Sequence, residues 1–281
     1  NDDAGTNDDA GTNDDAGTND DAGTNDDAGN ADDAGPSCDV SGLPTCCSGG
    51  PPQTELCDPN DQDLRLCFAL DPGPSVIDLT QPEALVSVKV TDGSAYGNHG
   101  ELTNGFVSNG TVTLSGLGQT AVSLSSSLGF GTAFSVEAWV YPTLLPPAGG
   151  RRGVVDHDGV FGLFLWEAQG TQEARCSGAG AVADGDAVVP LARWTHLACV
   201  FDGTALSLYV DGSLAAKTEV TGQLQAGTGE PLMVGANSPS GDGFVGQLDS
   251  VRIFARARSE EELCGAASAC TCGDFSWDEG N

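Results

Sequence analysis

Threonine recurs at an exact spacing near the start of the chain, where its hydroxyl groups are open to covalent modification. Residues 1–36 form six hexads, and the first four read Asn-Asp-Asp-Ala-Gly-Thr, which places threonines at Thr6, Thr12, Thr18 and Thr24. Because six divides evenly by two and by three, these threonines lie on one side of either a β-strand or a polyproline-II helix. Only small or polar residues flank them, so the pattern predicts O-glycosylation of an extended stalk or fibre.

A passive spacer is the alternative interpretation of this repeat. None of its small or polar side chains buries enough area to offset about 1–2 kcal/mol of backbone entropy per residue. Fully extended, the repeat would reach on the order of 110–120 Å. The last two hexads end in Asn30 and Pro36 in place of threonine. We expect any glycosylated region to end where Asn30 and Pro36 replace threonine.

Ten cysteines are the next candidates for chemistry, and their arrangement favours disulfides over a zinc site. An even number of cysteines in a chain with few lysines and many glycines is typical of an oxidising compartment. Zinc would require tetrahedral sets such as two Cys-x-x-Cys pairs, which this sequence lacks. We therefore predict a secreted, disulfide-bonded protein. The sequence leaves open the pairing of six cysteines: Cys38, Cys46, Cys47, Cys57, Cys270 and Cys272.

Acidic residues outnumber basic ones by 41 to 10, which gives a formal net charge of −31. Such a chain repels phosphate backbones, so we expect no nucleic acid partner. Solubility accounts for most of this charge, and divalent-cation binding is the more specific alternative. The sequence has no apolar run of about 18 residues, so we expect no membrane span. The chain begins at Asn1 and its only methionine is Met233, as expected for a processed or excerpted chain.

Short strands joined by tight turns dominate residues 67–267. The segments Trp194–Phe201, Ala205–Val210 and Leu214–Val220 are rich in β-forming residues. The dipeptides between them, Asp202-Gly203 and Asp211-Gly212, favour tight hairpin turns. Regularly spaced strands over about 200 residues predict an all-β antiparallel sandwich.

Two further elements complete this prediction. Phe134–Tyr141 is a strand in which alternate residues share one face, namely Phe134, Val136, Ala138 and Val140. Ser259 and Glu262 form a capping box, which predicts a short helix near the end of the chain. We expect four parts: an extended repeat (1–36), a Cys- and Pro-rich linker (37–66) stapled by disulfides, the sandwich (67–267) and a Cys-containing tail (268–281).

An ordered set of segments in the sandwich region resembles laminin-G-like (concanavalin A-like lectin/glucanase) jelly-roll domains. The segments are Asp92–Gly100, Phe134–Pro142, Trp194–Gly203, Leu208–Gly212 and Phe244–Phe254. The resemblance covers roughly residues 67–267 and implies a two-sheet antiparallel jelly roll. The hexads also resemble the Asp-Ala-Gly-Thr linkers of bacterial secreted proteins.

The resemblance implies two disulfides. In this fold the first and last strands are neighbours, so Cys67 on the first strand is expected to pair with Cys264 just beyond the last. Cys176 and Cys199 lie on segments that are expected to be adjacent in one sheet, so we expect them to pair as well.

The resemblance also implies a structural calcium ion. The candidate ligands are the carboxylates of Asp249 and Asp92 and an oxygen of Asn98, with carbonyls and waters completing the six to eight oxygens that Ca²⁺ takes. The alternative is that Asp249 accepts backbone hydrogen bonds and Asp92 starts a turn.

The jelly-roll fold also occurs in glycoside hydrolases, which need two carboxylates flanking the cleaved bond. In the strand Phe134–Tyr141, Glu137 is the single acidic residue. Packing explains the three histidines (His99, His157, His196), and we expect no enzymatic activity. Trp166 and Trp194 have rings suited to stacking on sugars, although core or rim packing is the alternative.

We therefore expect an extracellular structural or surface protein. Its glycosylated repeat would form a stalk or fibre with possible self-assembly, and its jelly-roll module would bind a glycan or a surface protein for adhesion or assembly. The first alternative is a carbohydrate-binding lectin whose repeat is a passive linker. A glycoside hydrolase is a remote alternative.

The glycosylation hypothesis predicts an intact mass well above the 28.4 kDa of the polypeptide. Glycopeptide mapping should place the excess on Thr6, Thr12, Thr18 and Thr24, because those hydroxyls recur in an open setting. A chain secreted by its native host with four unmodified threonines would show that the repeat is a bare spacer.

Overall fold

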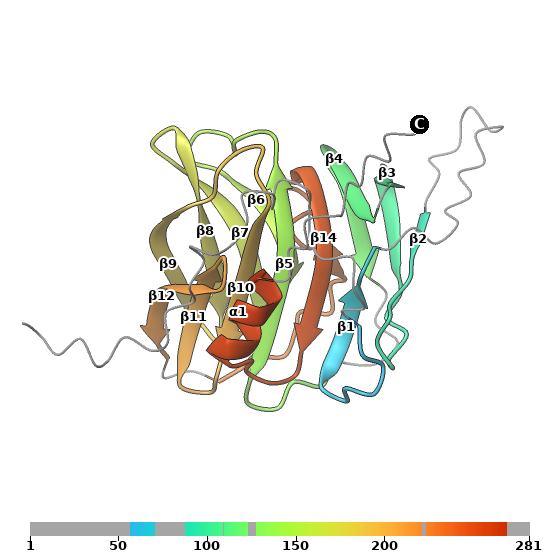
Figure 1. The fold of residues 1–281 in the computed structure, drawn as a ribbon, viewed down its shortest axis with the longest axis vertical. Coiled ribbons are helices and arrows are strands. Elements are labelled where there is room, and N and C mark those ends of the chain that lie inside the picture. The colour runs from blue at the N-terminus through green and yellow to red at the C-terminus, as the bar shows by residue number, and fades with distance from the viewer. Residues whose placement is uncertain (1–56, 71–87, 109, 123–127, 221–222, 269–281) are drawn as a thin grey trace, which may run out of the picture. The chain divides into compact units, whose positions relative to one another are not determined.

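The computed structural model describes residues 57–70, 88–108, 110–122, 128–220 and 223–268 (Figure 1). The repeat, the cysteines before Cys57, and Cys270 and Cys272 lie outside these ranges. The described elements are the following strands and helix: β1 Leu64–Phe68, β2 Val88–Val90, β3 Gly100–Ser108, β4 Thr111–Val122, β5 Phe134–Pro142, β6 Arg151–His157, β7 Phe161–Ala168, β8 Thr171–Gly178, β9 Ala181–Val188, β10 Thr195–Phe201, β11 Ala205–Val210, β12 Ser213–Glu219, β13 Leu232–Val234, β14 Val245–Phe254 and α1 Glu260–Ser268.

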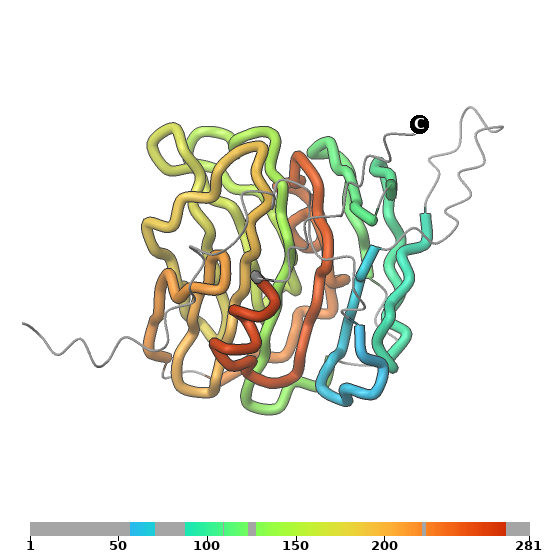
Figure 2. Tube along the Cα trace, viewed as in Figure 1, coloured from blue at the N-terminus to red at the C-terminus, as the bar shows by residue number. Residues whose placement is uncertain are grey.

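The strands form two antiparallel layers, as predicted, and β4 pairs with both layers. One layer runs in the order β12-β11-β10-β5-β14, and the other runs β13-β6-β7-β8-β9. The first half of β4 pairs with β14 and its second half pairs with β13, so this strand joins the layers. At the bend, Gly116 has a φ of +88°, which an L side chain rarely adopts. Figure 2 follows the chain through both layers.

The first and last strands are neighbours, as expected. β1 pairs with β14 in an antiparallel register that places Cys67 opposite Arg252. β1 begins at Leu64, before the boundary predicted at residue 67.

The predicted hairpins and helix cap are confirmed. β10, β11 and β12 pair consecutively through turns at Asp202-Gly203 and Asp211-Gly212. In the first turn, the Asp202 carboxylate accepts hydrogen bonds from the backbone N–H groups of Thr204 and Ala205. At the start of α1, the backbone N–H of Glu262 donates to the Ser259 hydroxyl (3.2 Å). The backbone N–H of Ser259 donates in turn to the Glu262 carboxylate (2.8 Å), which completes the capping box.

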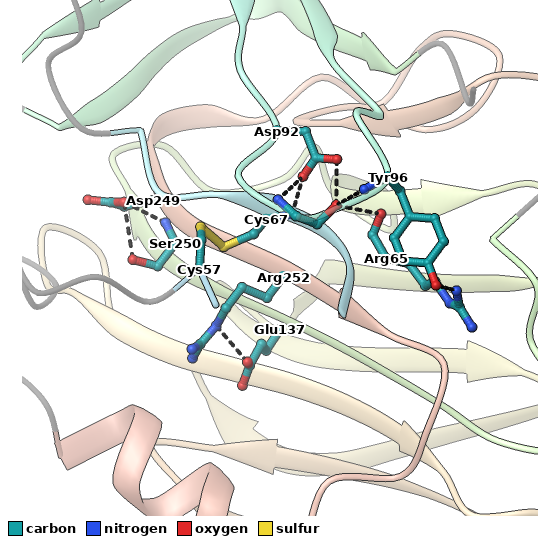
Figure 3. Close-up of a disulfide and its surroundings, with 10 residues drawn as sticks. Cys57, Arg65, Cys67, Asp92, Tyr96, Glu137, Asp249, Ser250 and Arg252 are labelled. Carbon is teal, nitrogen blue, oxygen red and sulfur yellow. Dashed lines mark hydrogen bonds and ion pairs between the residues drawn. A yellow bond between two sulfur atoms is a disulfide. The ribbon is translucent and has the colours of Figure 1, made fainter. Parts of the chain in front are cut away.

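Of the two predicted disulfides, one is wrong, and the other forms but for a different structural reason than expected. Cys176 and Cys199 are bonded, but they join β8 and β10, which belong to opposite layers and are not neighbours in a sheet. Cys67 is bonded to Cys57 and not to Cys264 (Figure 3). Cys264 is itself disulfide-bonded. The helix that carries Cys264 packs against β10 and β12, away from the edge of β14 where β1 lies.

The central strand β5 is buried on both faces. Phe134, Val136, Ala138 and Val140 point into the core between the layers, as predicted. The opposite face should have been solvated in a simple sandwich, but Ser135, Glu137 and Trp139 are also buried there. The segment that follows β14 covers this face. The Ser135 hydroxyl accepts a hydrogen bond from the backbone N–H of Arg258 (2.9 Å) and donates one to the carbonyl of Arg256 (2.8 Å).

Glu137 is the centre of a buried ionic network on this covered face. One carboxylate oxygen contacts Arg258 and lies 2.7 Å from Nε of Arg252, and the other lies 3.3 Å from Nε2 of His196. Burial alone would raise the pKa of Glu137, but the arginine charges and the adjacent His196 lower it to about 2. The network therefore joins β5, β10 and β14 to the segment that leads into α1.

Replacing this carboxylate should destabilise the domain. We expect Glu137→Gln to lower the free energy of unfolding at pH 7 by about 3–5 kcal/mol, because the buried Arg252 loses its counter-charge and Arg258 loses one of its two carboxylate partners. With the pKa lowered from 4.5 to about 2 in the folded state, the stabilisation by Glu137 is present above pH 4.5 and lost as the pH falls toward 2. Urea denaturation at pH 7 and pH 3 measures both effects.

The exposed Glu230→Gln is the matched control and should change stability by less than about 0.5 kcal/mol. Equal stability of Glu137→Gln and the wild type at pH 7 would contradict the assigned role of the network.

Candidate functional site

A pocket of about 380 Å³ opens on the outer face of the layer that contains β6, β7 and β8. Phe164 and Ser177 line it from positions that alternate with core residues such as Leu163, Leu165 and Cys176. The turn after β6, the turn after β8 and the loops around residues 225 and 237 form its rim. Strand alternation therefore supplies the floor of the pocket, and the loops supply its walls.

Asp156, at the end of β6, lines this pocket with only 6% of its surface exposed. Its Oδ2 accepts a hydrogen bond from the backbone N–H of Ser238 (2.7 Å), while no residue in the described ranges donates to Oδ1. A Cβ atom at Gly162 on the facing strand would lie 2.9 Å from Oδ1 and 2.2 Å from the Phe164 ring. The glycine thus keeps the space in front of this oxygen open.

The charge of Asp156 is poorly compensated. Loss of water raises its pKa to about 6, and the nearby carboxylates of Asp158 and Asp242 push in the same direction. The Ser238 N–H and the charge of Arg151 act against this shift but do not cancel it. A buried carboxyl with a raised pKa in a pocket is a candidate functional group.

Arg151 anchors one wall of the pocket. Its Nε lies 2.7 Å from Oδ2 of Asp242, and its Nη2 donates to Oδ1 of Asn237 (2.9 Å). The guanidinium also lies over the ring of Phe164, 4.4 Å from the centroid. The backbone N–H of Gly153 donates to the carbonyl of Asp242 (2.7 Å), which further holds the 237–242 loop against β6.

A strip of cations and aromatic rings extends from this wall across the face of the layer. The half-buried ring of Trp166 has Arg175 above it at 4.6 Å and Arg151 at 5.8 Å. Cation–π contacts of this kind hold planar side chains in a fixed orientation. The strip places an aromatic surface next to the polar pocket, an arrangement that suits ligands with both apolar and hydroxylated faces.

On the opposite rim of the pocket, Asp158 fixes the neighbouring loop. Its carboxylate accepts a hydrogen bond from the hydroxyl of Thr228 (2.9 Å), which holds the loop that carries Gln225. Gln225 is exposed at the rim, where its amide is free to contact a bound molecule. The pocket thus combines an unpaired acceptor oxygen, amide groups and a ring surface, which are suited to binding a polyhydroxylated ligand.

The two tryptophans considered from the sequence lie in different environments. Trp166 belongs to the strip beside the pocket. Trp194 is buried against Trp139 and the ring of Tyr141, whose centroid is 5.5 Å away. Trp194 is therefore a packing residue, in line with the alternative given above.

Two of the three candidate calcium ligands lie together. The carboxylate of Asp92 accepts a hydrogen bond from the backbone N–H of Cys67 (2.8 Å) (Figure 3). It also accepts hydrogen bonds from the backbone N–H groups of Ser94 (2.9 Å) and Asn98 (2.7 Å) and from the Ser94 hydroxyl (2.6 Å). The side-chain amide of Asn98 donates to the carbonyl of Arg65 (2.9 Å). Both oxygens of Asp92 are therefore engaged, as in the alternative of a carboxylate that organises a turn.

Asp249, the third candidate, accepts hydrogen bonds from the backbone N–H and the hydroxyl of Ser250. Within the described part of the chain, His, Cys, Asp and Glu side chains form no group of three or more that could hold a metal. Because both oxygens of Asp92 already accept hydrogen bonds, the structure does not favour Asp92 as a calcium ligand. Calcium binding here stays a prediction.

The main pocket residues were missed in the sequence analysis. Arg151, Asp156, Phe164 and Asn237 come from separate segments, and none stands in a recognisable catalytic or binding motif. The one local signal is Asp156-His-Asp-Gly159, in which two acids bracket a histidine at the end of an apolar strand.

Within the described residues, no helix is long and apolar enough to cross a membrane.

Comparison with known proteins identifies the fold. A family model described as the concanavalin A-like lectin/glucanases superfamily matches residues 115–264. A sialidase from Trypanosoma rangeli has a similar structure (TM-score 0.50, 16% identity), with 66% of this chain and 31% of the sialidase covered. Domain 4 of the extracellular arabinanase AbnA from Geobacillus stearothermophilus, solved with arabinotriose, is also similar (TM-score 0.45, 21% identity, 60% and 81% covered). No curated protein sequence matches significantly.

The unbalanced charge of Asp156 predicts a pH-dependent gain in stability for Asp156→Asn. Because the pKa is raised from 3.8 to about 6, the carboxyl favours folding fully below pH 3.8, and this contribution is lost as the pH rises through 6. The variant should therefore be more stable than the wild type by about 1–3 kcal/mol at pH 7.5. At pH 4 the two should differ little. Thermal and urea denaturation at both pH values measure the difference, and a variant that is less stable at pH 7.5 would contradict the argument.

Proposed function

Because the chain belongs to the concanavalin A-like lectin/glucanases superfamily, we propose that its sandwich is a carbohydrate-binding module that uses the Asp156 pocket. The observation that carries the proposal is the position of the Asp156 carboxyl: the residue lines the pocket with only 6% of its surface exposed, and no described residue donates to its Oδ1. The donor to this oxygen therefore comes from water or from a bound molecule. Sugar hydroxyls are such donors.

The surroundings of Asp156 support the same ligand class. The exposed amide of Gln225 offers donors and an acceptor at the rim. The Asn237 amide bonds Arg151 and the Ser238 carbonyl, and it has one further N–H and one further lone pair for a ligand. The rings of Phe164 and Trp166 offer apolar surface, against which the C–H faces of sugar rings pack. Arg151 and Arg175 hold these rings in place, so little side-chain entropy would be lost on binding.

The wider role that we propose is extracellular. The two described disulfides are suited to an oxidising compartment. A glycan-binding module joined to a repeat stalk would act in adhesion or assembly at a surface, and in that role the module recognises its ligand without cleaving it.

A glycoside hydrolase is the second candidate function, and one feature of the pocket favours it. Asp156 and Asp158 line the same pocket, and a carboxyl with a pKa of about 6 is suited to act as a general acid near neutral pH. The test of binding therefore needs a readout for cleavage as well.

A glycan array followed by calorimetry on the strongest ligands tests the proposal. We expect Asn237→Ala and Gln225→Ala each to weaken binding by about tenfold, as expected for loss of one or two hydrogen bonds in a desolvated site. Gln223→Ala, an exposed glutamine outside the pocket lining, is the matched control and should bind like the wild type.

Two results would contradict the proposal. One is the absence of any glycan ligand on the array, and the other is equal binding by all three variants. Release of reducing ends from a bound glycan, abolished by Asp156→Asn, would establish the hydrolase in place of the binding module.

A further inference from the structure

We propose that the pocket selects glycans that carry a free amino group, so that the ammonium of an amino sugar pairs with Asp156. This inference rests on the proposed function and specifies its ligand class.

Positive charge is in short supply around Asp156. The charged groups that act on it are Asp158 from the turn after β6, Asp242 from the facing loop, and Arg151 from β6 itself. Arg151 lies 2.7 Å from Asp242 and is therefore already engaged by another carboxylate. Three carboxylates thus face one guanidinium, which leaves two negative charges without a counter-charge.

A hydroxyl ligand would satisfy only part of this need. It would donate a hydrogen bond to Oδ1 of Asp156, but the charge would remain uncompensated in a site where only 6% of the residue is exposed to water. An ammonium group donates the same hydrogen bond and supplies the missing charge. Charge-assisted hydrogen bonds are roughly twice as strong as neutral ones.

Another buried carboxylate in this domain, Glu137, shows how the chain can compensate such a charge. Glu137 has no exposed surface, and two arginines and a histidine surround it. Its pKa is lowered to about 2, whereas that of Asp156 is raised to about 6. The chain surrounds Glu137 with counter-charges, whereas Asp156 has only Arg151, which is also paired with Asp242. A cationic ligand would supply the counter-charge that the pocket lacks.

The same charges disfavour acidic glycans. A sialic or uronic acid would bring a further carboxylate next to Asp156 and Asp158, and the net charge of −31 would oppose its approach. Neutral sugars would bind without this repulsion, but also without the gain from the ammonium.

The experiment compares three amino sugars, glucosamine, galactosamine and mannosamine, with their N-acetyl forms and with the parent neutral hexoses. Calorimetry at pH 6.5 and low salt should give at least one amino sugar that binds about tenfold tighter than both of its neutral counterparts. Its affinity should fall at pH 5, because Asp156 is then protonated. Asp156→Asn should abolish the preference, whereas the exposed Asp186→Asn, outside the pocket, should keep it.

The remaining outcomes overturn the inference. If N-acetyl or neutral sugars bind as tightly as the amino sugars, the preference for an ammonium group is wrong, while glycan binding itself stands. Calcium chloride or lysine amide that competes as well as the amino sugar would show a site for simple cations. If none of the amino sugars binds, the inference also fails, and the glycan array then decides separately whether the proposed function stands.

Discussion

Glu137 is a carboxylate with no exposed surface, so the surrounding side chains have to compensate its negative charge. Removing a carboxylate from water costs several kcal/mol unless opposite charges and hydrogen bonds are supplied. Arg252 on β14, Arg258 beyond it and His196 on β10 supply them. The segment after β14 must therefore return across β5 before α1 can begin. The helix position, the buried outer face of β5 and the position of Cys264 all follow from this return.

The network also makes the two outer faces of the sandwich different. The face of the β5 layer is covered by the C-terminal segment, and its charged groups are paired within the chain. The face of the β6–β8 layer keeps a pocket, with one carboxylate oxygen that no described residue satisfies. Natural proteins keep such destabilising groups chiefly where they bind or react. The contrast between Glu137 and Asp156 therefore supports the proposal that the ligand binds on the face of the β6–β8 layer.

The site is assembled from segments that are distant along the chain. Asp156 on β6 is bonded to the backbone of Ser238, and Arg151 reaches Asn237 and Asp242 across the same loop. No local spacing rule connects these residues, so the sequence pointed to Trp166 beside the pocket but to none of the residues that line it. The Cys67–Cys264 prediction failed for a related reason. Adjacent strands were inferred correctly, but the path of the chain between β14 and α1 was not.

By itself the sequence determined what depends on short-range chemistry. Alternating apolar residues identified β5, Asp-Gly turns identified the hairpins from β10 to β12, and Ser259 with Glu262 identified the helix start, because each signal acts within a few residues. Only the tertiary structure decided which disulfide Cys67 forms, which tryptophan is buried and which carboxylate is left uncompensated. Those outcomes depend on burial and on charges brought together from distant segments, because the strength of an electrostatic interaction is set by the final three-dimensional surroundings.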